Sequence, residues 1–392
     1  MTISLASAVS RLGTETAFDV LAKAKAMEQA GRDIINLGIG QPDFPTPDNI
    51  VQAAVKALLA GHHGYTPANG ILALREAVAE DIGKRRRCTV SPDAILIMPG
   101  GKPTMFFACL LFGEPGVEIM YPNPGFPIYE SAIRFSGATP VPIPLHEETG
   151  FSFSAEEVLA KITPATRLII VNSPANPTGG VVPRREIEIL VTGLERHPHV
   201  AVLSDEIYSR ILYDGVEPVS FLGFDSIRER LIVLDGWSKT YAMTGWRLGY
   251  SVWPKAIIDK ANRLSINDHS CVNHATQWAG IEALTGPQGA VDTMVAAFDE
   301  RRRVIVDELN SLPGFRCVNP GGAFYAFPNI TETGLSSRQM QDRLLEECGV
   351  AVVSGTSFGA FGEGFVRFSY ASSVDSIREA IARIRAWLPT AV

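Results

Sequence analysis

The segment Gly236-Trp-Ser-Lys239-Thr-Tyr-Ala-Met-Thr-Gly-Trp-Arg247-Leu-Gly-Tyr250 decides how this sequence is interpreted. It follows the apolar run Leu231–Leu234, which predicts a buried strand. Lys239 therefore lies just beyond a strand, where burial would lower the pKa of its amine and make it a nucleophile for a carbonyl group. Arg247 offers a planar fork of donors that suits a phosphate. A lysine is most often a solvated surface residue, so this interpretation depends on the rest of the chain.

Two other apolar runs also end in polar groups. Residues 200–204 form a short apolar run that is followed by Asp205 and Tyr208. Residues 167–171 form another, and the Pro/Asn/Gly turn that follows contains Asn176. In open α/β sheets, ligands bind outside the carboxyl ends of the strands. The sequence therefore predicts that these polar groups share one site with Lys239.

The chemistry of these groups suits a pyridine cofactor that carries an aldehyde and a phosphate, which is pyridoxal 5'-phosphate. Asp205 can pair with the ring nitrogen and keep it protonated. Asn176 and Tyr208 can donate hydrogen bonds to the ring hydroxyl, and Lys239 can form the Schiff base. We therefore predict Lys239, Asp205 and Tyr208 as the catalytic residues.

Helices and strands alternate from about residue 48 to residue 285, which predicts a mostly parallel sheet with helices on both faces. The expected helices lie near 48–60, 70–87, 102–113, 125–136, 154–161, 183–196 and 254–269, and the expected strands near 94–98, 116–121, 139–143, 167–171, 200–204, 231–235 and 248–252. After Gly286-Pro287 the pattern changes to a smaller α+β arrangement. It comprises a long helix near 288–311, a helix near 336–348 and a strand around 364–370.

Six segments, in order along the chain, resemble the class I (aspartate aminotransferase-like) family of fold-type I pyridoxal phosphate enzymes. They are Gly40-Gln-Pro-Asp-Phe44, Gly64-Tyr-Thr-Pro-Ala-Asn-Gly70, Asn176-Pro-Thr-Gly179, Ser204-Asp-Glu-Ile-Tyr208, Ser238–Tyr250 and Val366-Arg-Phe-Ser369. The resemblance implies an α/β fold with a three-layer α/β/α large domain, a mostly parallel sheet and a smaller α+β domain. It places a large cofactor-binding domain at 48–285 and a small discontinuous domain at 1–47 and 286–392.

The resemblance also implies where the cofactor phosphate binds. Gly100, Gly101 and Lys102 follow a predicted strand and open a helix, whose N-terminus attracts phosphate. A lone Gly-Gly is more commonly a plain strand-to-helix turn. The other phosphate ligands that the resemblance implies are Ser238, Arg247 and, from the neighbouring subunit, Tyr65. The family often has a serine three positions before the lysine, where this chain has Gly236.

The substrate contacts are likewise implied by the resemblance. Phe126 aligns with the aromatic residue that stacks on the pyridine ring, and the alternative is a core aromatic. Arg367 would clamp the substrate α-carboxylate as a bidentate pair, assisted by the Gly40 backbone and by Asn176. Lys102 faces the distal carboxylate in some prokaryotic relatives, which would suit aspartate or glutamate. The alternatives for Lys102 are a solvent-facing lysine and a phosphate ligand.

The implied reaction is the transfer of an amino group from an L-amino acid to a 2-oxo acid through the Schiff base, with ping-pong kinetics, in a homodimer with shared active sites. An aminotransferase for neutral or aromatic amino acids and a β-lyase or synthase are the alternatives on the same fold. A transcription regulator would need an added DNA-binding segment, and the helix expected at 16–31 leaves no room for one. In a nicotinamide enzyme the glycines at 38–40 would continue as a Gly-x-Gly-x-x-Gly pattern, which Gln41-Pro42 breaks.

The composition supports a folded enzyme without metal or disulfides. The 392 residues include 46% hydrophobic and 20% charged residues, and the net charge of −7 argues against nucleic acid or anionic membrane as a partner. We interpret the one basic run, residues 84–87, as a solvated face. The five cysteines are scattered and form no Cys-x-x-Cys pair, so we expect a reducing compartment, the cytoplasm, and no metal site. No apolar run is long enough for a transmembrane helix, and the N-terminus lacks the pattern of a signal peptide.

Overall fold

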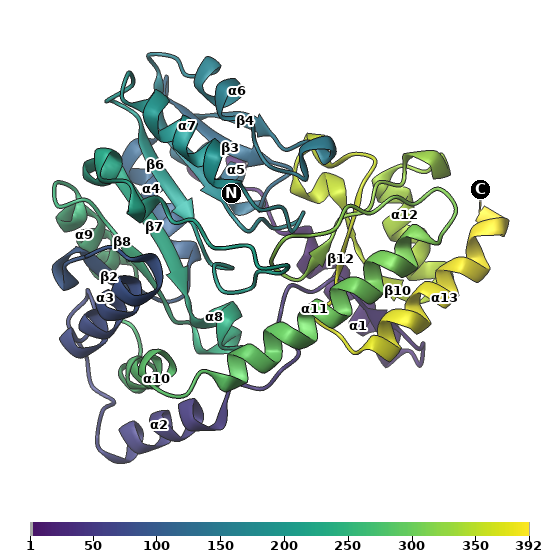
Figure 1. The fold of residues 1–392 in the computed structure, drawn as a ribbon, viewed down its shortest axis with the longest axis horizontal. Helices are drawn as coiled ribbons and strands as arrows, with labels where there is room; N and C mark the ends of the chain where they lie inside the picture. Colours follow the sequence, from purple (N-terminus) through teal and green to yellow (C-terminus); the bar gives the residue numbers. More distant parts are fainter. Residues whose placement is uncertain (1–2, 392) are drawn as a thin grey trace.

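A seven-stranded sheet forms the centre of the larger part of the molecule (Figure 1). The computed structural model describes residues 3–391, so the outermost residues of the predicted ranges 1–47 and 286–392 lie outside the described residues. The strand β8 is antiparallel to both of its neighbours, and the other neighbouring pairs are parallel. The order across the sheet is β2 (Ile95–Met98), β8 (Gly249–Val252), β7 (Leu231–Gly236), β6 (Ala201–Asp205), β5 (Thr166–Asn172), β3 (Glu118–Asn123) and β4 (Thr139–Pro144).

Helices cover both faces of this sheet because its strands are apolar on both sides. Along β5, Leu168 and Ile170 pack into one hydrophobic cluster, whereas Ile169 and Val171 pack into another. This double burial is typical of parallel strands. The first face is covered by α4 (Lys102–Phe112), α5 (Ile128–Ser136) and α9 (Ile258–His269). The second is covered by α3 (Leu72–Arg86), α6 (Ala155–Ala160), α7 (Arg184–Leu194) and α10 (His274–Thr285), and α2 (Asp48–Leu59) packs on α10.

A smaller α+β part is built from two short sheets. One pairs β1 (Ile35–Asn36) in parallel with β10 (Val350–Ala351), and the other has the antiparallel order β11 (Val353–Ser354), β12 (Val366–Ser369) and β9 (Tyr325–Ala326). Its helices are α1 (Thr16–Gln29), α11 (Gly289–Asn310), α12 (Ser337–Arg343) and α13 (Val374–Ala391). The predicted fold class is therefore confirmed: a three-layer α/β/α part with a mostly parallel sheet, and a smaller α+β part.

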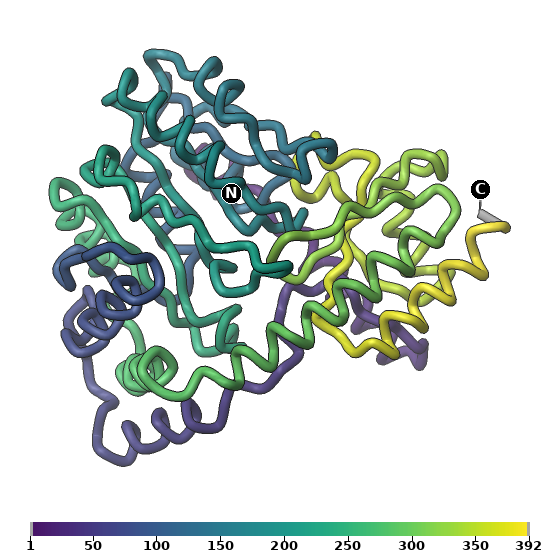
Figure 2. The backbone as a smooth tube through the Cα atoms, viewed as in Figure 1, coloured from purple at the N-terminus to yellow at the C-terminus, as the bar shows by residue number. Residues whose placement is uncertain are grey.

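The chain passes between the two parts at its N-terminal end and again at α11. In Figure 2 the purple trace contributes α1 to the small part before it reaches α2, which packs against α10. The long helix α11 leads back and packs against α13. The strands of the large sheet all lie between residues 95 and 252, and those of the small sheets lie outside that range. The domain boundaries at 47/48 and 285/286 stay a prediction.

Three α-helices among the described residues have no counterpart among the expected elements: the four-residue α8 (Trp237–Thr240), α10 and α13. The helix α10 begins after Asn273, whose side chain accepts a hydrogen bond from the Thr276 N–H at 2.9 Å, and ends at Gly286. Those two capping residues were the available signal. The C-terminal α13 was also missed. No helix among the described residues is both long enough and apolar enough to cross a membrane.

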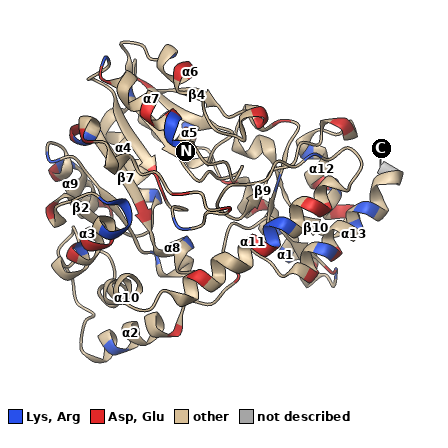
Figure 3. Cartoon of the chain, viewed as in Figure 1, with Lys and Arg blue, Asp and Glu red and all other residues tan. Residues whose placement is uncertain are grey.

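The basic run at 84–87 is not simply a solvated face, so that interpretation was wrong for Arg86. The ribbon segments coloured as charged residues lie mainly on the outer helices and loops in Figure 3. The Arg86 side chain is nevertheless only 8% exposed. Its guanidinium pairs with Glu206 at 2.9 Å and with Asp235 at 2.5 Å, and it donates to the Tyr250 hydroxyl at 2.8 Å. Burial raises the pKa of both carboxyl groups, and the Arg86 charge opposes that rise.

Replacement of Arg86 with methionine should therefore destabilise the fold strongly. It leaves two buried carboxylates unpaired, and breaking a buried ion pair typically costs about 3–5 kcal/mol. The neighbouring Arg87 is exposed, so Arg87→Met should change stability by less than about 0.5 kcal/mol. Urea denaturation of the two variants side by side measures the difference. The Arg86→Met deficit should shrink at acid pH, because the raised pKa values let the unpaired carboxyls take up protons. Equal midpoints would show that the carboxylates find other partners.

Candidate active site

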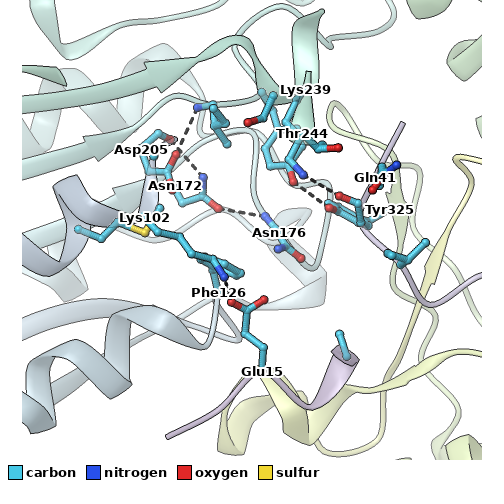
Figure 4. Close-up of a pocket in the computed structure, with 18 of the residues that line it drawn as sticks. Glu15, Gln41, Lys102, Phe126, Asn172, Asn176, Asp205, Lys239, Thr244 and Tyr325 are labelled. Carbon is cyan, nitrogen blue, oxygen red and sulfur yellow. Dashed lines mark hydrogen bonds and ion pairs between the residues drawn. The ribbon is translucent and has the colours of Figure 1, made fainter. Parts of the chain in front are cut away.

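A cavity of about 590 Å³ opens at the carboxyl ends of β5, β6 and β7. Both parts of the molecule contribute to its wall. Asp205 ends a strand of the large sheet and Lys239 follows another, whereas Tyr325 and Arg367 come from the three-stranded sheet of the small part. Figure 4 shows the labelled side chains converging on this space. The structure thus brings most of the predicted site residues together. Those that line the cavity are Gly40, Gly101, Lys102, Phe126, Asn176, Asp205, Tyr208, Ser238, Lys239, Arg247 and Arg367.

Lys239 lies on the short helix α8 (Trp237–Thr240), which begins directly after β7. Its ammonium donates a hydrogen bond to the Gly40 carbonyl at 2.6 Å. Burial lowers the pKa of Lys239 to about 8, and the positive charge of Arg367 adds to this effect. The amine can therefore lose its proton near neutral pH, which a nucleophile for a carbonyl requires.

Asp205 is the last residue of β6 and is only 2% exposed. One carboxylate oxygen accepts a hydrogen bond from the Tyr129 hydroxyl at 2.6 Å, and the other accepts from the Ile207 N–H at 3.2 Å. Burial raises the pKa of Asp205 to about 7, although the Tyr129 hydrogen bond acts in the opposite direction. A carboxylate that is shielded from water in this way needs a cationic partner, and a protonated ring nitrogen would supply one.

The side chain of Asn172 links the end of β5 to the end of β6 and to the backbone of Asn176. The Asn172 amide donates to the Asp205 carbonyl at 3.1 Å, and its oxygen accepts from the Asn176 N–H at 3.0 Å. Tyr208 and Tyr325 share a hydrogen bond between their hydroxyls at 2.8 Å. Asn176 and Tyr208 are indicated by the sequence motifs, whereas their hydrogen-bond partners Asn172 and Tyr325 carry no such signal.

Arg367 is buried between two rings, with its guanidinium 4.6 Å from the Tyr325 centroid and 4.7 Å from that of Phe358. It donates to the Asn176 side-chain oxygen at 2.8 Å and to the Gly38 carbonyl at 2.5 Å. Its Nε is buried and has no hydrogen-bond partner among the described residues. The guanidinium therefore retains donor capacity for an anion. Its backbone contact is with Gly38, whereas Gly40 contacts Lys239.

Three glycines allow close backbone packing at the end of the cavity where the cofactor phosphate is expected to bind. A Cβ atom on Gly236 would lie 2.9 Å from the Gly249 Cα, and one on Gly249 would lie 2.7 Å from the Gly100 carbonyl carbon. The serine often found in the family at position 236 therefore cannot be accommodated here. A Cβ atom on Gly100 would collide with the Arg247 guanidinium, so the loop and the arginine form a close cradle.

This cradle fits a phosphate. Gly101 precedes α4, whose N-terminus favours an anion. Arg247 donates to the Pro99 carbonyl at 3.0 Å and remains exposed within one chain. With the buried Asp205 at one end of the cavity, the residues present suit a ligand that has a ring nitrogen and a phosphate.

Phe126 lines the cavity beside Tyr129, with ring centroids 5.8 Å apart in an edge-to-face arrangement. Tyr65 is placed differently: it is 92% exposed and is not among the described residues that line the cavity. Among residues 3–391, no group of three or more His, Cys, Asp or Glu side chains could hold a metal ion.

Lys102 points into the cavity from the first turn of α4, and its ammonium forms an ion pair with Glu15. The sequence analysis missed Glu15, because an acidic residue before a helix is most often explained as a favourable helix end. It also missed Tyr129, since nothing local in the sequence links it to Asp205.

Known proteins resemble this chain over nearly its whole length. The sequence profile described as "Aminotransferase class I and II" matches residues 32–384. The chain is 38% identical to an aspartate aminotransferase of Bacillus sp. (strain YM-2), over 97% of this chain and 98% of that protein. It is also 38% identical to aromatic-amino-acid aminotransferase 2 of Thermococcus litoralis, over 91% and 92% respectively. The crystal structure of the aspartate aminotransferase from Rhizobium meliloti superposes with a TM-score of 0.94 at 34% identity and covers 99% of both chains.

The fold and the site therefore define a pyridoxal phosphate-dependent transaminase. The chain belongs to the class I and II aminotransferase family, and the resemblance inferred from its motifs is confirmed. The cofactor of aminotransferases of this type is pyridoxal 5'-phosphate, as the sequence analysis expected.

The lowered pKa of Lys239 can be tested on protein freed of cofactor. Methylation of its amine by formaldehyde and cyanoborohydride should reach half its maximal rate near pH 8, because only the neutral amine reacts. A lysine of ordinary pKa, about 10.4, would still be largely protonated there. Peptide mass spectrometry measures the rate at Lys239. Arg367→Met should move this midpoint to higher pH, because it removes a nearby positive charge; an unchanged midpoint would exclude that contribution.

Proposed function

We propose that the residues of this cavity carry out the amino transfer in the following roles. When bound, pyridoxal phosphate supplies an electron-withdrawing ring that weakens the bonds at the Cα of an amino acid. Lys239 would hold the cofactor aldehyde and then move the proton at Cα. Asp205 would keep the ring nitrogen protonated, and Tyr208 and Asn176 would bond the ring hydroxyl. The observation that carries this proposal is the Lys239 amine, with its lowered pKa, in one cavity with the buried Asp205 and Arg367.

The phosphate would be held by Gly100 and Gly101, by Ser238 and by Arg247. This assignment is supported by the N-terminus of α4 and by the closeness of Gly100 to the Arg247 guanidinium. Phe126 would stack on the ring from the wall of the cavity.

The α-carboxylate of the substrate would bind to Arg367. The free Nε of this guanidinium supports the role, and its two occupied nitrogens fix the orientation through Asn176 and Gly38. A planar carboxylate matches such a donor fork. Gly40, whose carbonyl holds the Lys239 ammonium, would keep this lysine facing the same point.

For the side chain of the substrate, we propose a dicarboxylic amino acid such as aspartate or glutamate. Lys102 supplies the cation that would face the distal carboxylate. The alternative is a neutral or aromatic amino acid, because the relatives at 38% identity include both an aspartate and an aromatic-amino-acid aminotransferase. The family relatives named above are all aminotransferases, which favours transamination over a β-lyase or synthase.

We also propose a homodimer with shared active sites. Tyr65 would reach the phosphate of the neighbouring subunit, and its 92% exposure in a single chain is consistent with a role outside its own cavity. Arg247, on the exposed side of the cradle, is the point that such a residue would approach.

Lys239→Ala should abolish amino transfer while the protein remains folded and retains bound cofactor. Loss of a general base alone lowers a rate by about 10²–10⁴-fold, and loss of the covalent link adds to this. The measurement is the rate of amino transfer from aspartate, alanine and phenylalanine to 2-oxoglutarate, and from glutamate to oxaloacetate. The exposed Lys255→Ala is the matched control. Release of pyruvate and ammonia from cysteine, whose thiol can leave from Cβ, without the 2-oxo acid would indicate a lyase. Near-normal transfer by Lys239→Ala would end the assignment.

Hybrid dimers test the shared site. If Tyr65 completes the neighbour's site, a Tyr65→Ala subunit still offers an intact Lys239, and a Lys239→Ala subunit still offers an intact Tyr65. Mixing the two weakly active variants under conditions of subunit exchange should then restore part of the activity in one site of each hybrid. No recovery, when exchange is verified by mass spectrometry, would show that Tyr65 serves its own subunit.

A further inference from the structure

The ion pair between Glu15 and Lys102 lies within the wall of the substrate cavity (Figure 4). The Glu15 side chain is 13% exposed and that of Lys102 is 44% exposed, so the carboxylate is the more deeply placed partner. The Lys102 ammonium also lies 5.5 Å from the centroid of the Phe126 ring and 5.6 Å from that of Phe18. Lys102 is the only hydrogen-bond partner of the Glu15 carboxylate among the described residues.

The chain before α1 holds Glu15 in this position. The Gly13 N–H donates to the Ser131 hydroxyl at 2.9 Å, and the Arg11 Nε donates to the Arg134 carbonyl at 2.7 Å. Both acceptors belong to α5 of the large part, whereas α1, which follows Glu15, packs against β10 and β11 of the small part. Glu15 thus stands where the two parts meet over the cavity.

Cations outnumber acids in the wall of the cavity, and Glu15 is one of the few acids there. The described residues of the wall include four cations, Lys102, Lys239, Arg247 and Arg367, but only two acids, Asp205 and Glu15. Asp205 lies at the end of β6 and is bonded to Tyr129. Glu15 is therefore the acid that is paired with the one cation assigned to the side chain of the substrate.

We propose that Glu15 is a specificity-determining residue that occupies, on Lys102, the place of the substrate's distal carboxylate. This inference rests on the proposed amino transfer. While the pair is closed, the Lys102 charge is neutralised, and the rings of Phe18 and Phe126 offer an apolar wall to an aromatic or neutral side chain. A dicarboxylic substrate displaces Glu15, because two carboxylates close to one ammonium repel each other. The N-terminus of α1 favours negative charge and so stabilises the displaced carboxylate.

The test uses two amine-free probes that bind the holoenzyme without reacting: maleate, a dicarboxylate, and 3-phenylpropionate, an aromatic monocarboxylate. Calorimetry gives the Kd of each for the unmodified enzyme and for Glu15→Gln, which keeps the shape of the side chain but not its charge. Maleate should bind Glu15→Gln about 1.5- to 5-fold more tightly, the range expected for a partly exposed ion pair. Binding of 3-phenylpropionate should be unchanged or weaker, because Lys102 is then left uncompensated.

Two further variants complete the experiment. In Lys102→Met, maleate should bind more weakly, and adding Glu15→Gln to that variant should no longer favour maleate through Lys102. Glu28→Gln is the control for the loss of one negative charge from the N-terminal segment of the chain. Glu28 is exposed near the end of α1, so this variant should leave both Kd values unchanged.

Equal shifts for both probes in Glu15→Gln, or weaker binding of maleate, would overturn the inference. The proposed function is judged separately by the transfer assay: an unmodified enzyme that transfers amino groups while Glu15→Gln shows no selective shift keeps the function and loses the role of Glu15. An unmodified enzyme without amino transfer fails at the function itself.

Discussion

The pairing of three parallel strands is the constraint on which the site depends. In the register of β5 with β6, Asn172 lies opposite Asp205, and in that of β6 with β7, Asp205 lies opposite Leu234, shortly before the turn that carries Lys239. Backbone hydrogen bonds therefore set the spacing of the chemical groups, and side-chain contacts such as that of Asn172 with the Asp205 carbonyl refine it. A shift of one residue would turn each of these side chains to the opposite face of the sheet.

The same burial that stabilises the sheet tunes the site. Asp205 is removed from water, so the pKa of its carboxyl rises to about 7, and that of Lys239 falls to about 8 for the same reason. The pKa values of both groups therefore lie close to neutral pH, although in water they would differ by more than about six units. The surplus of cations around the cavity complements a ligand set of a phosphate and carboxylates.

The sequence predicted the parts of the structure that are encoded locally. Apolar runs in the sequence located the strands of the large sheet. Asp205 and Lys239 were predicted as site residues because they stand at or just beyond the ends of β6 and β7, and the carboxyl ends of parallel strands meet at one edge of the sheet. The contacts it missed join distant segments. Glu15 reaches Lys102 and Tyr129 reaches Asp205 through the packing of helices, and no local pattern specifies these approaches. The burial of Arg86 was missed for the same reason: its neighbours in the basic run are exposed.

The close approach of the backbone at Gly236, Gly249 and Gly100 limits which substitutions the chain can accept at these positions. A Cβ atom on Gly236 would lie against the Gly249 backbone and one on Gly249 against the Gly100 backbone, whereas one on Gly100 would meet the Arg247 guanidinium. The residue that ends β7, the strand β8 and the phosphate loop therefore pack backbone to backbone. A side chain at position 236 would displace the backbone at position 249, and one at position 249 would displace that at position 100. Because Gly249 lies in both contacts, the effects of substitutions at neighbouring positions of this stack are expected to be non-additive. A chain with a larger residue at position 236 therefore requires a different path for the strand that carries position 249.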